Sequence, residues 1–382
     1  MVKTVRFGII GLGLMGREFA SAAARWPHLP EMDIRPEIVA LCDQNLEPAE
    51  WFGRICPGVT QVVSDYRELL ANPEVDAVYC AVPHNLHARF YCDAIRAGKH
   101  LLGEKPFGID RAANDLINAA IKENPDVLVR CSSQFPFTPA VQHLCDMIER
   151  NAFGEIIEVE AGFLHSSDIN PNKPINWKRI IEINGEYGCM GDLGMHPCHV
   201  PFRAGWIPQN VRAVLSNIVR ERPTASGERV PCETWDNATL FCETTDSVSG
   251  RMFPMTLKMQ RIAPGETNTW YINVLGTSAS ARFSTKNINT VEVLEYDGRQ
   301  QNWQIVDIGH ATAFKSVTGG IFEFGFSDAI LQMWAGFLYE LNHRTPLKRF
   351  AGCVTPEEVA LSHRLFSAAL RSQASATTEH VG

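Results

Sequence analysis

The chain has 382 residues, of which 45% are hydrophobic and 20% are charged, and its formal net charge at pH 7 is −8. This length allows two domains of ordinary size, each with a core of its own, and the composition excludes extended disorder. A nucleic-acid-binding protein needs a cationic face to neutralise phosphates, so the negative charge favours a small-molecule partner.

The cysteines and the N-terminus bear on the cellular compartment. The eleven cysteines show no paired C-x-x-C spacing, which argues against a disulfide framework or a zinc ribbon. Residues 1–8 enter a strand directly, without the basic and apolar segments of a signal peptide. No apolar run approaches the roughly 20 residues of a membrane-spanning helix. We therefore expect a cytoplasmic protein that contacts neither membrane nor nucleic acid.

The first third of the chain alternates strands with helices. Val5–Ile10 is an apolar run that predicts a strand, and the spaced apolar face of Met15–Arg25 predicts a helix. A second strand is expected at Ile38–Cys42. The alternation continues with helices at Tyr66–Ala71, His87–Ala97 and Asp110–Glu123, and strands at Ala77–Ala81, His100–Gly103 and Val127–Ser132. Such alternation is typical of an α/β domain with a doubly wound parallel sheet.

After the proline-bearing segment Phe135–Pro139, the sequence pattern changes from alternating strands and helices to mostly strands. We therefore divide the chain into a first domain, residues 1–132, and a second, α+β domain, residues 133–382. A closing helix over residues 354–372 is predicted by Thr355, Pro356 and two acids in the first turn. One large, open-faced, mostly antiparallel sheet is predicted by the apolar runs Ile156–Leu164, Val211–Val219, Asn237–Glu243, Ser249–Leu257 and Trp270–Gly276.

A glycine-rich turn connects the first strand to the first helix. Its residues form a G-x-G-x-x-G motif: Gly11, Leu12, Gly13, Leu14, Met15 and Gly16. The first glycine permits the turn, the second lets a pyrophosphate approach, and the third lets the helix pack on the strand. Asp43 ends the second strand, and a carboxylate at this position repels a 2′-phosphate. The pattern predicts a Rossmann domain that binds NAD rather than NADP.

Three further motifs point to one family. Val82-Pro83-His84-Asn85-Leu86-His87 and Gly103-Glu104-Lys105-Pro106 each follow a predicted strand, and Gly191-Asp192-Leu193-Gly194-Met195-His196 comes later. In this order they resemble the glucose-fructose oxidoreductase, inositol dehydrogenase and MocA family. The resemblance implies a Rossmann domain followed by an open-faced sheet domain. It also implies a homodimer or homotetramer that assembles through the outer face of that sheet.

The resemblance implies that Lys105, Asp192 and His196 are catalytic. Oxidising a carbinol releases a hydroxyl proton, and histidine is the side chain whose pKa lies nearest working pH. Lys105 can polarise the same oxygen, and Asp192 can orient the imidazole or bind substrate hydroxyls; the roles of Lys105 and His196 can also be exchanged. The implied cofactor-binding set is Gly11, Leu12, Gly13, Leu14, Met15, Gly16, Asp43, Pro83, Asn85, His87, Glu104, Lys105 and Gln134.

The implied substrate-binding residues are aromatic and polar, as suits a polyol or sugar. Lys178 and Arg179 are either a solvated charge pair or a recognition site for an anionic group on the sugar. Two departures from the family pattern suggest an unusual substrate: His199 stands where many members have an aspartate, and Gln134-Phe135 replaces an arginine-phenylalanine pair. The full implied set is His165, Asn176, Trp177, Lys178, Arg179, Tyr187, Asp192, His196 and His199.

A zinc site is the alternative interpretation of the cluster near the histidine motif. Sulfur, imidazole and carboxylate groups all bind zinc. The cluster matches no standard ligand spacing, and Lys105 already supplies an electrophile, so we expect no metal. Its members are Cys189, Asp192, His196, Cys198 and His199.

The leading hypothesis is an NAD-dependent dehydrogenase or reductase of a sugar, sugar acid or cyclitol. The alternative is an NAD-dependent glycosidase, as some relatives of this family are, which oxidises a ring hydroxyl, eliminates the aglycone, adds water and reduces the ring again. That cycle needs an additional base, and His165, Tyr187 and His199 are the candidates. A regulatory module that binds NAD or a sugar without turnover is disfavoured by the intact catalytic set.

Overall fold

The computed structural model describes residues 2–308 and 312–382. These residues form two compact units. Unit 1 comprises Met1–Gly108, Ala112–Thr138 and His310–Pro356, and unit 2 comprises Ile109–Arg111, Pro139–Gly309 and Glu357–Gly382. The division expected from the sequence, at residues 132 and 133, differs from this arrangement because a late segment returns to the first unit.

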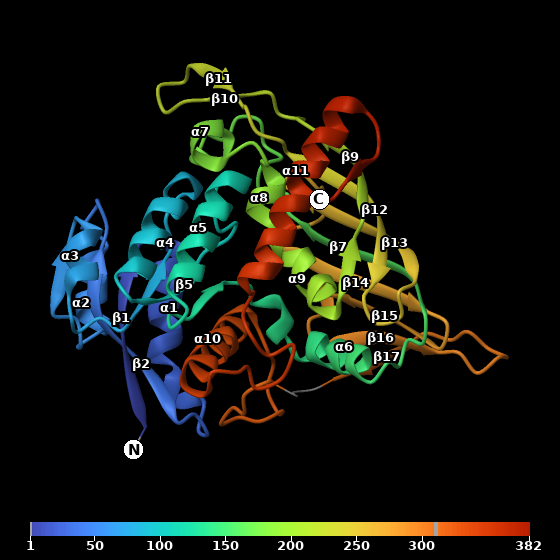
Figure 1. The fold of residues 1–382 in the computed structure, drawn as a ribbon, viewed down its shortest axis with the longest axis horizontal. Helices are drawn as coiled ribbons and strands as arrows, with labels where there is room; N and C mark the ends of the chain where they lie inside the picture. The colour runs from blue at the N-terminus through green and yellow to red at the C-terminus, as the bar shows by residue number, and fades with distance from the viewer. Residues whose placement is uncertain (1, 309–311) are drawn as a thin grey trace. The chain divides into compact units, whose positions relative to one another are not determined.

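Unit 1 is built on a six-stranded sheet in the order β3-β2-β1-β4-β5-β6, in which every neighbouring pair is parallel. This confirms the doubly wound parallel sheet (Figure 1). Burial of the central strands on both faces explains their near-continuous apolar sequences. The strands are β1 (Lys3–Ile10), β2 (Ile34–Cys42), β3 (Gln61–Val63), β4 (Ala77–Cys80), β5 (His100–Gly103) and β6 (Val129–Cys131).

The helices of unit 1 include one from the last fifth of the chain, α10 (Phe326–His343), which packs on α1 and β2. Its Trp334 joins an aromatic cluster with Phe7, Phe19 and Tyr79. The sequence analysis did not identify this helix, which lies far along the chain from the strands that it covers. The other helices are α1 (Leu14–Ala24), α2 (Ala49–Ile55), α3 (Tyr66–Ala71), α4 (His87–Arg96) and α5 (Arg111–Glu123).

Unit 2 contains a large sheet in the order β17-β16-β15-β14-β7-β13-β12-β9-β18, with β8 beside β12. All its pairs are antiparallel except β7 with β13, so the prediction of a mostly antiparallel sheet is confirmed. A separate two-stranded ribbon is formed by β10 (Glu221–Pro223) and β11 (Arg229–Pro231). The sheet strands are β7 (Ile156–Leu164), β8 (Trp206–Pro208), β9 (Asn210–Ser216), β12 (Asn237–Asp246), β13 (Met252–Gln260), β14 (Thr269–Gly276), β15 (Ala279–Ser284), β16 (Thr290–Glu295), β17 (Gln304–Asp307) and β18 (Glu379–His380).

Helices cover one face of this sheet. α8 (Cys189–Leu193) and α9 (Met195–Ala204) pack on β12, β13, β14 and β7, and α6 (Pro139–Glu149) packs on β15 and β16. The strands alternate accordingly, with Leu240 and Leu257 buried on the helix side. On the outward side Phe241 and Val214 are exposed. The remaining helices are α7 (Ile181–Asn184) and α11 (Pro356–Ser375), which begins at the predicted proline.

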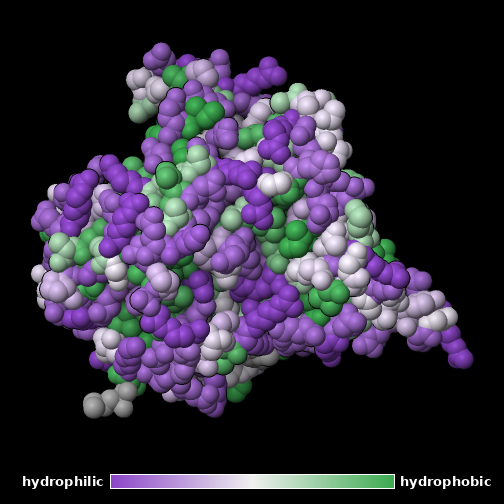
Figure 2. All heavy atoms as spheres, viewed as in Figure 1, coloured by the Kyte–Doolittle hydropathy of each residue, from purple (hydrophilic) through white to green (hydrophobic). Residues whose placement is uncertain are grey.

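The surface shown in Figure 2 is mostly hydrophilic, with scattered hydrophobic side chains. Among the described residues, none of the helices is long and apolar enough to cross a membrane.

Candidate functional site

The three motif glycines each have a distinct steric reason to be glycine. Gly11 has φ +97°, and a Cβ there would lie 2.3 Å from the carbonyl oxygen of Ala81. A Cβ on Gly16 would lie 2.2 Å from the Gly11 oxygen. A Cβ on Gly13 would meet no atom within 4 Å. The first and third glycines therefore close the turn, whereas the second borders open space at the start of α1, where a pyrophosphate fits.

Asp43 lies at the same turn. Its Oδ2 accepts a hydrogen bond from the Leu12 amide at 2.7 Å, and its Oδ1 accepts one from the Asn45 amide at 2.9 Å. The end of β2 and the glycine turn are thus tied together, as expected for the acid that recognises the adenosine ribose. The glycine turn, the start of α1 and the Asp43 carboxylate together fit NAD.

The loop after β4 contains the second motif. Pro83 precedes a single turn of 3-10 helix, η2 (His84–Leu86), and Asn85 is exposed on it. His87 is fully buried: its Nε2 lies 3.0 Å from the Val82 oxygen, and its Nδ1 accepts a hydrogen bond from the Gly108 amide. Both ring nitrogens of His87 therefore contact the backbone, and a contact of this residue with the cofactor stays a prediction.

Glu104 and Lys105 follow β5. The Glu104 Oε1 accepts hydrogen bonds from Tyr79 Oη and Ser132 Oγ, each at 2.7 Å, and the Glu104 carbonyl accepts one from Tyr91 Oη. Burial and the neighbouring Glu104 raise the pKa of Tyr79 well above its usual value, so this phenol stays a donor. Glu104 therefore anchors the backbone from which the partly buried Lys105 projects.

Gln134 lies in unit 1, at the N-cap of the 3-10 turn η3 (Phe135–Phe137). Its side chain is largely buried. The chain passes from unit 1 to unit 2 between Thr138 and Pro139, within the proline-bearing segment Phe135–Pro139 near which the boundary was expected.

Asp192 and His196 belong to unit 2 and lie on consecutive short helices, α8 and α9. Both residues are largely buried. Gly194 connects the two helices. The position favours glycine, because a Cβ there would lie 2.4 Å from the Met190 oxygen. The His196 ring packs edge-on against Phe163 with 5.2 Å between ring centroids, and its carbonyl accepts a hydrogen bond from Trp270 Nε1. The His196 backbone is thus tied to Trp270, and its ring packs on Phe163.

Two cations meet the Asp192 carboxylate. Lys178 Nζ lies 2.9 Å from Asp192 Oδ2, and Arg261 Nη2 lies 3.3 Å from the same oxygen. Lys178 belongs to the 3-10 turn η4 (Trp177–Arg179), whose first amides are capped by Asn176. The predicted Lys178 therefore lies beside the predicted Asp192, 14 residues further along the chain.

Arg179 has a different environment from Lys178. It is fully buried, with Nη2 2.7 Å from Asp168 Oδ2 and Nη1 paired with Asp236. An anionic substrate would have to displace one of these buried carboxylates. This pairing argues against recognition of an anionic sugar by Arg179, which instead connects the loops of unit 2 that carry Asp168 and Asp236.

Tyr187 and His199 are also interior residues. The Tyr187 hydroxyl lies 2.7 Å from Ser367 Oγ, and burial raises its pKa to about 12. His199 is buried near the Arg203–Glu358 ion pair, and burial, with Arg203, holds its pKa well below 6.5. Both side chains are buried, and their contact with a substrate stays a prediction.

His165 remains compatible with a substrate role. It follows β7, is half-buried, and its Nδ1 lies 2.9 Å from the Thr267 oxygen. Its ring packs edge-on against Phe163, the same ring that contacts His196. Two histidines thus flank one phenylalanine.

The sequence analysis missed Phe163 and Arg261. Phe163 is one of several apolar residues of a strand, and Arg261 is a single arginine after a strand, so neither carries a local signal. Their importance arises from contacts with residues far along the chain.

No group of three or more histidine, cysteine, aspartate or glutamate side chains within residues 2–308 and 312–382 is arranged to hold a metal ion. Cys189 and Cys198 are fully buried, and burial raises the pKa of Cys189 to about 12.

Several sugar-converting enzymes are similar to this chain in sequence. Levoglucosan dehydrogenase of Pseudarthrobacter phenanthrenivorans is 29% identical over 232 residues, which are 59% of this chain and 57% of that protein. A dTDP-3,4-didehydro-2,6-dideoxy-alpha-D-glucose 3-reductase of Actinomadura kijaniata is 30% identical over 50% of this chain and 54% of that protein. Glycosyl hydrolase family 109 protein 1 of Bacteroides thetaiotaomicron is 29% identical over 46% of this chain and 38% of that protein. Each of these matches thus spans less than two thirds of the relative.

The whole fold is shared with solved structures. An oxidoreductase domain protein from Kribbella flavida superposes with a TM-score of 0.88 at 20% identity and covers 100% of both chains. Levoglucosan dehydrogenase in complex with NADH and L-sorbose superposes with a TM-score of 0.87 at 22% identity, over 100% of this chain and 99% of that one. Residues 5–130 match the model of an oxidoreductase family with an NAD-binding Rossmann fold. The chain is thus similar to the Gfo/Idh/MocA oxidoreductase family over its NAD-binding region.

Proposed function

We propose that the protein transfers a hydride between NAD and a carbinol carbon of a sugar, sugar acid or cyclitol. The observation that carries this proposal is the glycine turn, where Gly13 borders open space and Asp43 is tied to the Leu12 amide. The named activities of the sugar-converting relatives support the substrate class.

The proposed chemistry assigns one task to each catalytic residue. Bound NAD⁺ supplies the hydride acceptor. As the carbinol C–H bond gives up its hydride, the hydroxyl proton passes to an imidazole nitrogen of His196, which leaves a carbonyl product and an imidazolium. Lys105 donates a hydrogen bond to the reacting oxygen, and Asp192 accepts one from a substrate hydroxyl. The reverse direction uses the same groups.

The environment of Arg179 favours a neutral sugar over a strongly anionic one. Arg179 is neutralised by buried carboxylates, and Lys178 is paired with Asp192. The substrate-facing role in this segment is therefore proposed for Trp177, Lys178 and His165.

An NAD-dependent glycosidase remains the second candidate. The similarity to glycosyl hydrolase family 109 protein 1 and the position of His165 beside Phe163 favour it. Of the three candidates for the additional base, Tyr187 and His199 are buried, whereas His165 is half-buried.

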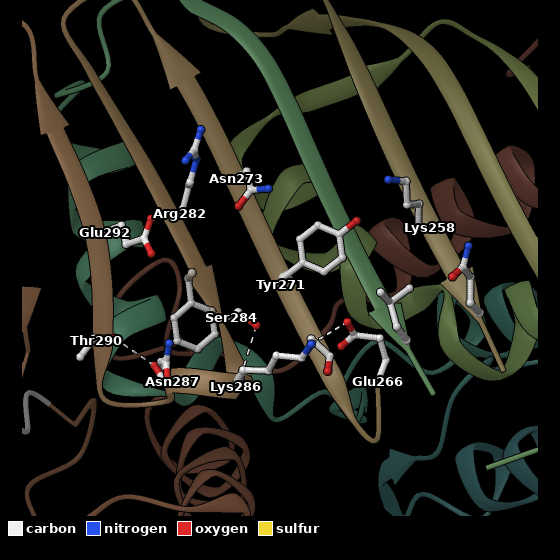
Figure 3. Close-up of a pocket in the computed structure, with 14 residues that line it drawn as sticks. Lys258, Glu266, Tyr271, Asn273, Arg282, Ser284, Lys286, Asn287, Thr290 and Glu292 are labelled. Carbon is white, nitrogen blue, oxygen red and sulfur yellow. Dashed lines mark hydrogen bonds and ion pairs between the residues drawn. The ribbon is translucent and has the colours of Figure 1, made fainter. Parts of the chain in front are cut away.

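We propose a homodimer or homotetramer that forms through the outward face of the large sheet. This face carries exposed Val214, Phe241 and Met252 beside a charged groove of about 470 Å³ (Figure 3). In the groove, Lys258 Nζ and Tyr271 Oη both bind Glu160, and Lys286 pairs with Glu266. Paired charges with apolar residues suit an interface between copies.

A cytoplasmic location is proposed from the cysteines. All eleven are free thiols, and all are buried, as expected in a reducing compartment. The proposed partners are a small-molecule substrate and further copies of the chain.

The deciding experiment mixes purified protein and NAD with free sugars, including levoglucosan, and with aryl glycosides. Steady accumulation of NADH with a free sugar supports the dehydrogenase. Release of aglycone over many turnovers without net NADH supports the glycosidase instead. His196→Asn is expected to abolish turnover while NADH binding persists, and retained turnover would exclude His196 as the acid/base.

A further inference from the structure

Arg261 is a buried arginine that follows β13 and faces a catalytic candidate. Only 2% of its surface is exposed. Its Nε and Nη2 both lie 3.3 Å from Asp192 Oδ2. Two nitrogens of one guanidinium therefore approach a single carboxylate oxygen, an arrangement that limits rotation of the carboxylate.

The rest of the guanidinium is fixed by the chain around it. Nη1 donates to the Lys178 carbonyl at 3.0 Å, and Nη2 lies 3.3 Å from Asn184 Oδ1 and 3.4 Å from the Gly188 carbonyl. The Arg261 amide donates to the Asp236 carbonyl at 3.0 Å. Arg261 thus connects β13 with the start of α8 and with η4, so its head group has little freedom to move.

Lys178 completes the arrangement from a more exposed position. Its Nζ lies 2.9 Å from Asp192 Oδ2, and its side chain is 38% exposed. Its carbonyl accepts hydrogen bonds from Arg261 and from Thr234 Oγ1, the latter at 2.7 Å. The two cations that meet Asp192 are therefore coupled to each other through the Lys178 backbone.

We infer that Arg261 is a positioning residue that, together with Lys178, fixes the ionised Asp192 carboxylate on α8, the helix directly before the one that carries His196. The inference rests on the proposed function, in which Asp192 binds the substrate. A carboxylate fixed as an anion only accepts hydrogen bonds. The group that it recognises must therefore be a donor, such as a sugar hydroxyl next to the reacting carbon.

Other charged groups near Asp192 in unit 2 are accounted for. Cys189 is a buried thiol whose pKa is raised to about 12, mainly by burial, so it is uncharged at neutral pH. Asp236 is paired with Arg179. His196 follows on α9. Lys178 and Arg261 are thus two cations of this unit that contact the Asp192 carboxylate.

The test compares pH profiles of kcat/KM for two matched lysine variants, with NAD and levoglucosan or another sugar that the wild type oxidises. Lys178→Met removes a cation from Asp192, whereas Lys258→Met removes a similarly exposed lysine that pairs with Glu160 at 2.8 Å. His196 as the base and Asp192 as an anion give the profile two acid-side steps. Loss of one cation from the carboxylate is expected to move the lower acid limb, set by Asp192, upward by about one pH unit in Lys178→Met. Lys258→Met is expected to leave that limb in place. Equal profiles for the two variants overturn the inference.

Arg261 is tested by its own pair of variants. Arg261→Lys keeps the charge but loses the planar head group, so its kcat/KM is expected to lie between the wild type and Arg261→Met. The control for a buried arginine is Arg222→Met, because Arg222 binds the carbonyls of Asn170 and Asp168 rather than Asp192. An acid limb that moves equally in Arg261→Met and Arg222→Met overturns the assignment of Arg261.

A readout without turnover separates this inference from the proposed function. If the wild type oxidises none of the sugars, the proposed function fails, and the contact with Asp192 is then tested by unfolding. Asp192→Asn, Arg261→Met and the double variant form a cycle. A double variant that loses less in unfolding midpoint than the sum of the single losses supports the contact. Strictly additive losses overturn it.

Discussion

The indole of Trp334 stacks on the ring of Phe19, with 3.6 Å between ring centroids and 29° between ring planes. Phe19 belongs to α1 and Trp334 to α10, so residues near the two ends of the chain share one core. The Rossmann unit is complete only when α10 covers its sheet.

Trp334→Ala is expected to lower the free energy of unfolding by about 3–5 kcal/mol, because it removes a fully buried aromatic ring from this core. Guanidinium unfolding followed by circular dichroism measures the loss. Leu116→Ala, at a residue of α5 that is 60% exposed, is the control and should change stability by less than about 0.5 kcal/mol. Similar losses in both variants would contradict the role given to α10.

Gly13→Ala and Gly16→Ala should separate cofactor binding from folding. The added methyl at Gly13 meets no protein atom, so stability should persist while NADH affinity falls at least about tenfold, because the methyl occupies pyrophosphate space. At Gly16 the methyl meets backbone 2.2 Å away, and stability should fall by about 1–3 kcal/mol. Calorimetric titration with NADH and thermal unfolding measure the two effects. Unchanged NADH affinity in Gly13→Ala would refute the assignment.

Arg179→Met is expected to destabilise the protein rather than change substrate preference. It leaves the buried carboxylates of Asp168 and Asp236 without this partner, which costs about 3–5 kcal/mol. Chemical unfolding measures the loss. Among folded molecules, KM for an anionic sugar and for its neutral analogue should change equally. A selective rise for the anionic sugar would restore the anion-recognition hypothesis.

Acid should weaken unit 2 through Asp168. Burial alone raises the pKa of this carboxyl, but the hydrogen bond from Lys173 and the charges of Arg179, Lys173 and Arg222 outweigh it and lower the pKa below 3.8. A group with a lowered folded pKa contributes stability that is present above its unfolded pKa and is lost as pH falls through the folded value. The difference in unfolding free energy between wild type and Asp168→Asn should therefore shrink as pH falls below about 4. A difference independent of pH would contradict this.

Phe241→Glu should disrupt the proposed assembly. Phe241 is 50% exposed on the outward face of the sheet, and a charge there opposes burial against a second copy. Size-exclusion chromatography with light scattering should show a smaller species. Val248→Glu, at an 82% exposed site in the turn after β12, should leave the mass unchanged. A monomeric wild type would exclude the assembly.

Local patterns were sufficient for much of the fold. The strands β5 and β7 and the helix α3 have the bounds that their apolar runs predicted, and α11 begins at the predicted Pro356. The glycine turn and Asp43 were also predictable, because a tight turn and a strand end depend on residues close together in sequence. Short elements such as α2 and β3 lacked a long enough periodic pattern.

The sequence by itself determined three features of the proposed site: a dinucleotide-binding turn, a lysine after a strand, and an aspartate four residues before a histidine. Only the tertiary structure decided which partner each charged side chain contacts. Lys178 meets Asp192, whereas the adjacent Arg179 is neutralised by Asp168 and Asp236. Consecutive residues in a turn point in different directions. The partner of each charged side chain therefore depends on how separate segments pack together, which no local pattern encodes.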